Sequence, residues 1–187
     1  MHVKILRLFV AFGLVFPIIS CQSQVSDKTQ TKIDRQPVVA GSFYPSDKNE
    51  LVKMLEGFFN EAPVVLDKQP LAVIVPHAGY VFSGGVAAAS YKQIDRNKKF
   101  KHVFIIGSSH TMYFDGASVY SHGDFITPLG KVKVDTLAQW LDKKYNIINS
   151  DIQPHEKEHS IEVQLPFLQY WLKNPFTIIP IIIGGES

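Results

Sequence analysis

Two histidines, His77 and His110, have the type and placement expected of metal ligands. His77 stands two residues after the apolar run 71–75, and His110 stands four residues after the apolar run 102–106. If the two runs are neighbouring parallel strands, both imidazoles lie at the carboxyl edge of one sheet, where ligands of α/β proteins bind. Neutral imidazole is a common ligand of divalent first-row metals, so the pair predicts part of an open metal site.

A further group of polar residues surrounds His159. Glu158 and Glu162 are four residues apart and would share one face of a helix, with His159 beside them. Glu158 and His159 could support the metal ligands or act as an acid–base pair, so we treat both as candidates for catalysis. The alternative is a charged helix start, in which the glutamates stabilise the helix dipole.

Other chemistries have weaker support in the sequence. A single loop histidine is more often a surface or hydrogen-bonded residue than a ligand. Ser108 and Ser109 precede His110, but there is no G-x-S-x-G motif to support a serine hydrolase. A P-loop and a dinucleotide-binding fingerprint are also missing. The other histidines have no comparable context and are expected to be structural or exposed: His2, His102, His122 and His155.

The predicted site depends on a βαβ unit. The runs 71–75 and 102–106 are short, apolar and rich in β-branched residues, which is typical of strands covered on both faces. Small residues at 84–90 predict a helix between them that lies close to the sheet. The spacing of the two runs fits parallel strands joined by a right-handed crossover.

Local signals support this arrangement. Apolar residues in 46–61 recur at helical spacing, and Asp47 is placed to cap that helix. Gly84 and Gly85 are expected to open the next helix and leave room for an anion, and Gly107 is expected to allow a sharp turn before His110.

The second half of the chain has a mixed pattern. It predicts short strands at 117–120 and 131–134 with a turn at 128–130, a helix capped by Asp135, a helix from 160 that Pro166 kinks or ends, and an apolar strand at 176–183. The predicted fold class is α/β, with a mixed, largely parallel sheet flanked by helices. Because a buried strand and a glycine turn usually lead into another helix, we expect the sequence to be truncated at its C-terminus.

The N-terminus has the pattern of an export signal. Lys4 and Arg7 precede an uncharged apolar run, which is too short to span a bilayer but suits a signal peptide at 1–20. Cys21, the single cysteine, follows a small residue as in a bacterial lipobox, although an ordinary cysteine after a cleaved signal is the alternative. The sequence thus predicts a lipidated tether at 21–36, a domain at 37–187, and a lipid-anchored location in the bacterial cell envelope.

Composition limits the possible partners. The chain has 19 Lys and Arg residues against 17 Asp and Glu residues and is 45% hydrophobic, which is typical of a globular domain. Removing residues 1–20 would leave 17 charges of each sign. Without a basic stripe, nucleic acid is not an expected partner. The expected partners are a small-molecule or peptide ligand in the cleft and a membrane bound through the N-terminal lipid.

Five motifs occur in an order and spacing that resemble the Memo family, also described as AmmeMemoRadiSam system protein B. They are AGSFYP at 40–45, PHAGY at 76–80 with Ser83-Gly84, GSSH at 107–110, EHSIE at 158–162 and IIP at 178–180. The resemblance covers about residues 36–187. It implies a fold similar to the class III extradiol dioxygenases, which are non-haem iron enzymes that open catechol rings.

The resemblance also implies roles for individual residues. His77 and His110 match the family's histidine ligands, and Tyr80 and Ser109 of the same motifs are expected to contact substrate. The family's third ligand, typically a cysteine, lies in a C-terminal half that this sequence does not contain. The expected cofactor is therefore a divalent metal, iron or copper, with its third ligand missing from this chain.

Two functions follow from these expectations. The first is a metal-dependent oxidoreductase of dioxygenase type, in which the metal orients substrate and O₂. The second is a non-catalytic module that binds a peptide or partner in the same cleft and keeps a vestigial metal site. The fold alone does not decide between them, because one fold can host many functions.

Overall fold

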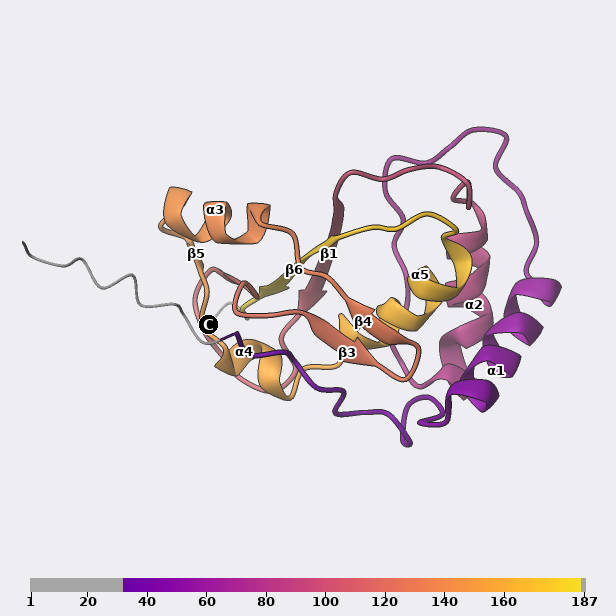
Figure 1. The fold of residues 1–187 in the computed structure, drawn as a ribbon, viewed down its shortest axis with the longest axis horizontal. Helices are drawn as coiled ribbons and strands as arrows, with labels where there is room; N and C mark the ends of the chain where they lie inside the picture. Colours follow the sequence, from indigo (N-terminus) through magenta and orange to yellow (C-terminus); the bar gives the residue numbers. More distant parts are fainter. Residues whose placement is uncertain (1–31, 186–187) are drawn as a thin grey trace, which may run out of the picture.

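The computed structural model describes residues 32–185 (Figure 1). The predicted signal peptide, Cys21 and most of the predicted tether lie outside the described residues. In chain order the elements are α1 (Lys48–Glu61), α2 (Tyr80–Lys92), β1 (Val103–Ser108), β2 (Ala117–Val119), β3 (Phe125–Thr127), β4 (Gly130–Val132), α3 (Leu137–Lys144), β5 (Ile148–Asn149), α4 (Gln153–Glu156), the 3₁₀ turn η1 (Glu162–Gln164), α5 (Leu165–Trp171) and β6 (Ile178–Ile183).

The main sheet has four strands in the order β1-β6-β2-β5. β6 is parallel to β1 and antiparallel to β2, and β2 is parallel to β5. A separate antiparallel pair is formed by β3 and β4. The helices α1, α2 and α5 gather at one end of the molecule and α3 lies at the other, with the sheet between them (Figure 1). The prediction of a mixed, largely parallel sheet flanked by helices is confirmed.

The predicted strand at 71–75 does not form. The segment is extended but carries no ladder of backbone hydrogen bonds, and Ile74 is 99% exposed. A strand needs a hydrogen-bonded neighbour, and among the described residues the sheet ends at β1. The predicted βαβ unit is therefore wrong, although α2 does connect 71–75 with β1. The parallel pair that does form joins β1 with β6.

The helical end of the molecule forms the larger part of the core. Leu51, Leu55 and Phe59 line the buried face of α1, as the helical spacing predicted. The Asp47 side chain accepts hydrogen bonds from the backbone N–H groups of Asn49 and Glu50, which confirms it as the N-cap. Phe59 stacks on the rings of two α5 residues, Tyr170 and Trp171.

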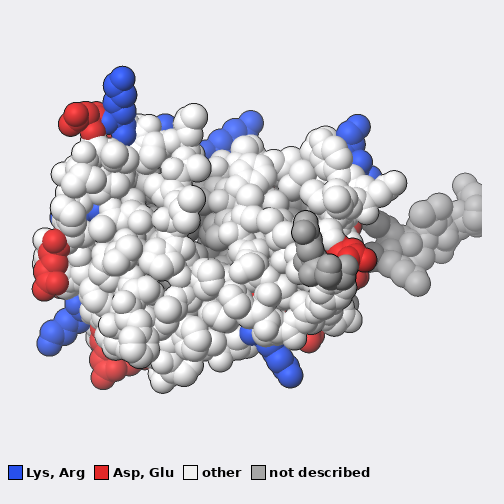
Figure 2. Space-filling model, turned by 180° about the vertical axis from the view of Figure 1, so that it is seen from behind, with Lys and Arg blue, Asp and Glu red and all other residues white. Residues whose placement is uncertain are grey.

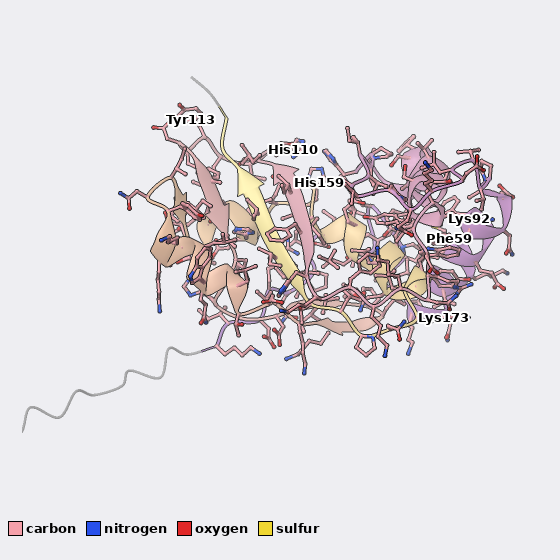
Figure 3. The ribbon with its side chains drawn as sticks, turned by 90° about the horizontal axis from the view of Figure 1, so that it is seen from above. Phe59, Lys92, His110, Tyr113, His159 and Lys173 are labelled. Atoms are coloured by element: carbon pink, nitrogen blue, oxygen red, sulfur yellow. The ribbon has the colours of Figure 1, made fainter. Side chains whose placement is uncertain are left out.

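Helix α2 begins at Tyr80, several residues earlier than predicted. Gly84 therefore lies inside the helix and does not open it. A Cβ atom at Gly84 would stand 2.3 Å from Phe58 Cε2, so the missing side chain lets α1 and α2 approach closely. The Nζ atom of Lys92, at the end of α2, donates to the carbonyl oxygens of Phe59 and Ala62 (Figure 3). The predicted use of Gly84 in anion binding is wrong, because the position serves helix packing.

Other predicted elements are corrected in detail. The turn at 128–130 joins β3 to β4, and β3 was not predicted. The predicted helix from 160 is the single 3₁₀ turn η1 followed by α5, with Pro166 in the first turn of α5. Among residues 32–185, no helix is long and apolar enough to cross a membrane.

Candidate metal centre

Three histidine side chains meet at the carboxyl end of β1. One ring nitrogen from each of His77, His110 and His159 lies within 4.8 Å of the other two. The Nε2 atoms of His77 and His110 are 3.3 Å apart. The ring of His159 is centred 4.7 Å from that of His110 and 5.8 Å from that of His77. The predicted meeting of His77 and His110 is therefore confirmed, and Figure 3 shows His110 and His159 close together beyond β1.

Each histidine comes from a different part of the chain. His77 lies in the segment that enters α2, His110 lies in the loop that leaves β1, and His159 lies between α4 and η1. The ring of Phe43 packs against the His159 ring at 4.8 Å and limits its movement. Because the three histidines are far apart in the sequence, the sequence analysis assigned His159 to catalysis and expected the third metal ligand to be missing. The described chain does supply a third imidazole.

Glu158 fixes the orientation of His110. Its carboxylate accepts a hydrogen bond from the His110 backbone N–H at 2.6 Å and lies 3.0 Å from Nδ1 of the same residue. It also accepts hydrogen bonds from the backbone N–H groups of His159 and Ser160. With Nδ1–H donated to Glu158, the Nε2 lone pair of His110 faces the other two histidines. Carboxylate–histidine pairs of this kind commonly orient metal ligands.

The electrostatics favour neutral imidazoles at His77 and His159 beside an ionised Glu158 carboxylate. Burial alone would raise the pKa of Glu158, but the hydrogen bonds from His110 and Ser160 outweigh it and lower that pKa to about 2. Burial lowers the pKa of His77, and the nearby His110 adds to this effect. Burial also lowers the pKa of His159. The imidazole ligands of a metal must be unprotonated, so these shifts favour metal binding at neutral pH.

Close approach at Gly107 brings Ser160 against β1. A Cβ atom at Gly107 would stand 2.3 Å from Ser160 Oγ, and this hydroxyl donates to the carbonyl oxygen of Ser108. Gly107 lies within β1 and does not form the sharp turn that was predicted. Its function in the structure is to leave space for the segment that carries Glu158 and His159.

Glu162 has a different environment from Glu158. Its buried carboxylate pairs with Arg35 and accepts hydrogen bonds from the Tyr44 hydroxyl and the Val38 and Val39 backbone N–H groups. Arg35 also donates to the Glu158 carbonyl oxygen. The prediction that Glu158 and Glu162 share a helix face is wrong, because no helix spans both. Arg35 is buried, so packed structure begins before residue 37, where the domain was predicted to start.

A cavity of about 890 Å³ adjoins the histidines. His77 and His159 line it together with apolar side chains of Phe43, Val81 and Phe82. This mixture of an apolar wall and a few ring nitrogens is typical of small-molecule sites.

The two predicted substrate contacts have no support in this geometry. Tyr80 is 2% exposed, and its hydroxyl donates to the Val163 carbonyl oxygen in the core. The Ser109 hydroxyl donates to the Met112 carbonyl oxygen. Among the described residues, neither side chain lines the cavity beside the histidines.

The other described histidines lie away from this group. His102 pairs with Asp135 at 2.7 Å, His122 contacts the Ser150 carbonyl oxygen, and the buried His155 contacts the Ser118 carbonyl oxygen. Their structural roles agree with the sequence analysis. His2 lies outside the described residues.

Comparisons with known proteins agree with the motifs. The family model described as Memo-like protein matches residues 35–187. A MEMO1 family protein of Thermoplasma volcanium is 43% identical over 154 residues, one of Methanobrevibacter smithii is 42% identical over 165, and one of Pyrococcus abyssi is 44% identical over 158. Each alignment covers 82% of this chain but only 54–58% of the relative. This chain belongs to the Memo-like protein family.

Proposed function

We propose that His77, His110 and His159 bind one divalent first-row metal, iron or copper, as the centre of an oxidoreductase of dioxygenase type. The observation that carries the proposal is the convergence of three ring nitrogens within 4.8 Å. Nitrogen ligands about 2.1 Å from one ion are separated by about 3–4 Å, so small side-chain rotations would complete the site. Imidazole donors suit iron and copper, and three of them leave coordination positions open.

The residues around the histidines fit this use. A bound iron or copper ion would supply redox and Lewis-acid chemistry at this edge of the sheet. Glu158 would hold the His110 ring in place through its Nδ1–H group. The apolar cavity beside His77 and His159 would hold the apolar part of a small molecule or peptide.

Metal binding by the purified full chain tests the proposal directly. The chain is loaded with Fe(II) without oxygen, or with Cu(II), and bound metal is measured by elemental analysis after gel filtration. We expect one ion per chain and at least a 100-fold loss of affinity in His77→Ala, His110→Ala and His159→Ala. His122→Ala is the matched control, because His122 lies outside the cluster. Unchanged binding in the three cluster variants would exclude the proposed site.

Measuring oxygen consumption distinguishes an oxidoreductase from a non-catalytic binding module. The iron-loaded chain is mixed with catechols in an oxygen-electrode cell, and ring opening is followed by absorbance. Uptake of O₂ that His110→Ala abolishes supports the oxidoreductase. A chain that binds stoichiometric metal but consumes no oxygen would favour the binding module instead.

We also propose that Cys21 carries lipid and anchors the protein in the cell envelope. The motif before Cys21 supports this, since a charged start and an apolar run lead directly to it. Labelling with a fatty-acid analogue in a bacterial host should mark the wild-type protein and spare Cys21→Ser. Equal labelling of both proteins would contradict the proposal.

A further inference from the structure

The strand β1 has one open edge. It pairs with β6 on one side, and among the described residues no strand pairs with it on the other. The backbone N–H groups of Val103 and Ser109 donate to Thr177 and Ile183, which fixes the alternation of the parallel ladder. In such a ladder every second residue bonds to the same neighbour, so the N–H and C=O groups of Phe104 and Ile106 face the open edge. Open edges of this kind are ready to pair with another strand.

An apolar groove runs along this edge. A cavity of about 660 Å³ has β1 on one side and the segment 69–75 on the other. The exposed fractions are 52% for Phe104 and 61% for Ile106, and Leu71 and Ile74 are almost fully exposed. Contiguous apolar surface next to an open strand edge is unusual in a protein without a partner.

The lining of the groove is uncharged. None of the described residues that line it is Asp, Glu, Lys or Arg, and its floor includes Tyr91 and Leu168 from the helices. Figure 2, which views the side opposite to Figure 1, shows a hollowed centre free of charged side chains, with the charges at the margin. An occupant should therefore also be apolar and uncharged.

Both walls of the groove lead to the metal centre. The segment 69–75 continues to His77 and β1 continues to His110, and the Nε2 atoms of these histidines are 3.3 Å apart. An extended chain seated between the walls would therefore place one of its ends beside the histidines. The groove is bordered by the open edge of β1 and could accept a strand. The cavity that faces Phe43 and Phe82 is not lined by β1.

The lengths of the relatives indicate where such a strand could come from. This chain spans only 54–58% of the relatives, so each relative contains further sequence outside the aligned region. We propose that the groove binds an apolar β-strand from that further part of a Memo-family protein, hydrogen-bonded to Phe104 and Ile106 of β1. This strand site does not depend on the proposed metal.

A peptide series tests the proposal with the purified full chain. Overlapping peptides of the Thermoplasma volcanium relative, taken from outside the aligned region, are titrated by fluorescence anisotropy. Amide exchange followed by mass spectrometry then reports on segments 69–75 and 103–108. We expect a contiguous group of apolar peptides to bind and to slow exchange in both segments at least tenfold, whereas a scrambled sequence does neither.

Two variants and a control decide whether the strand edge is used. Ile106→Pro removes an N–H group from the open edge without removing one from the β6 ladder, and Ile74→Asp places a charge on the opposite wall. Each should weaken peptide binding at least tenfold while circular dichroism stays unchanged. Val65→Asp, which places the same charge at an exposed apolar residue outside the groove, should bind as the wild type does.

Three outcomes would overturn the proposal. One is that no peptide of the series binds. Another is equal binding to the wild type and to folded Ile74→Asp. The third is slow amide exchange in β1 without any peptide, if it becomes slower as the protein concentration rises and light scattering shows a dimeric mass. That result would assign the groove to a second copy of the chain.

Discussion

At the scale of single residues, Glu158 is the side chain that most clearly prepares His110 for a metal. It is buried, ionised and bonded to both the ring and the backbone of His110. Glu158→Gln should lower metal affinity by about 10–100-fold, because the amide is a weaker and less selective acceptor for Nδ1–H. Isothermal titration with Zn(II) or Co(II) measures this. The exposed Glu156→Gln should keep wild-type affinity, and an equal loss in both variants would argue against an orienting role.

His155 makes stability depend on pH. Burial lowers its pKa from the ordinary 6.5 to about 4, and the nearby Arg35 adds to the shift. The unfolded chain binds the proton near pH 6.5 and the folded chain only near pH 4. The stability due to neutral His155 is therefore complete above pH 6.5 and is lost as the pH falls from 6.5 towards 4.

The expected loss is about 1.4 kcal/mol per pH unit, or about 3 kcal/mol at pH 4. Urea unfolding at several pH values measures it. His155→Gln can still donate to the Ser118 carbonyl oxygen but does not titrate, so its stability should vary less between pH 6.5 and 4. An unchanged pH slope in this variant would show that another group is responsible.

At the scale of elements, Gly107 sets the distance between β1 and the segment before η1. Gly107→Ala would place a methyl group against Ser160 and Ile161, in a site with no space for it. We expect a loss of about 1–3 kcal/mol in the free energy of unfolding, the usual cost of overpacking. Because the shift would move Glu158 away from His110, metal affinity should fall as well.

Gly57→Ala supplies the comparison for this variant. A Cβ atom at Gly57, on α1, meets no atom within 4 Å. Alanine at this helical position should be neutral or stabilising. Chemical denaturation and metal titration of both variants test the argument, which fails if Gly107→Ala retains wild-type stability and affinity.

At the scale of the whole molecule, the buried Arg35–Glu162 pair joins the first described segment to the turn that follows His159. Glu162→Gln leaves a buried guanidinium without its counter-charge. We expect a loss of about 3–5 kcal/mol in the free energy of unfolding, as for other broken buried pairs. Thermal and urea unfolding measure this.

The exposed pair of Lys131 and Asp34 is the natural comparison. Lys131→Ala should cost no more than about 1 kcal/mol, since water screens that pair. Similar losses for Glu162→Gln and Lys131→Ala would mean that the buried network does not hold the domain together.

The sequence by itself determined the features that depend on neighbours along the chain. Helical spacing and the Asp47 cap predicted α1, and continuous apolar runs predicted β1 and β6, because these signals come from local backbone geometry and periodicity. The motifs also identified the family. The meeting of His77 and His110 was predicted correctly, although the neighbouring parallel strands on which that prediction rested do not form.

Only the tertiary structure decided which contacts form between distant segments. The run 71–75 has strand composition, yet it lacks a hydrogen-bonded neighbour among the described residues and stays outside the sheet. Glu158 and Glu162 are close in sequence, but packing directs one towards His110 and the other towards Arg35. His159 joins the metal centre for the same reason: its neighbours there come from segments about 50 and 80 residues away, and no local pattern encodes such distances.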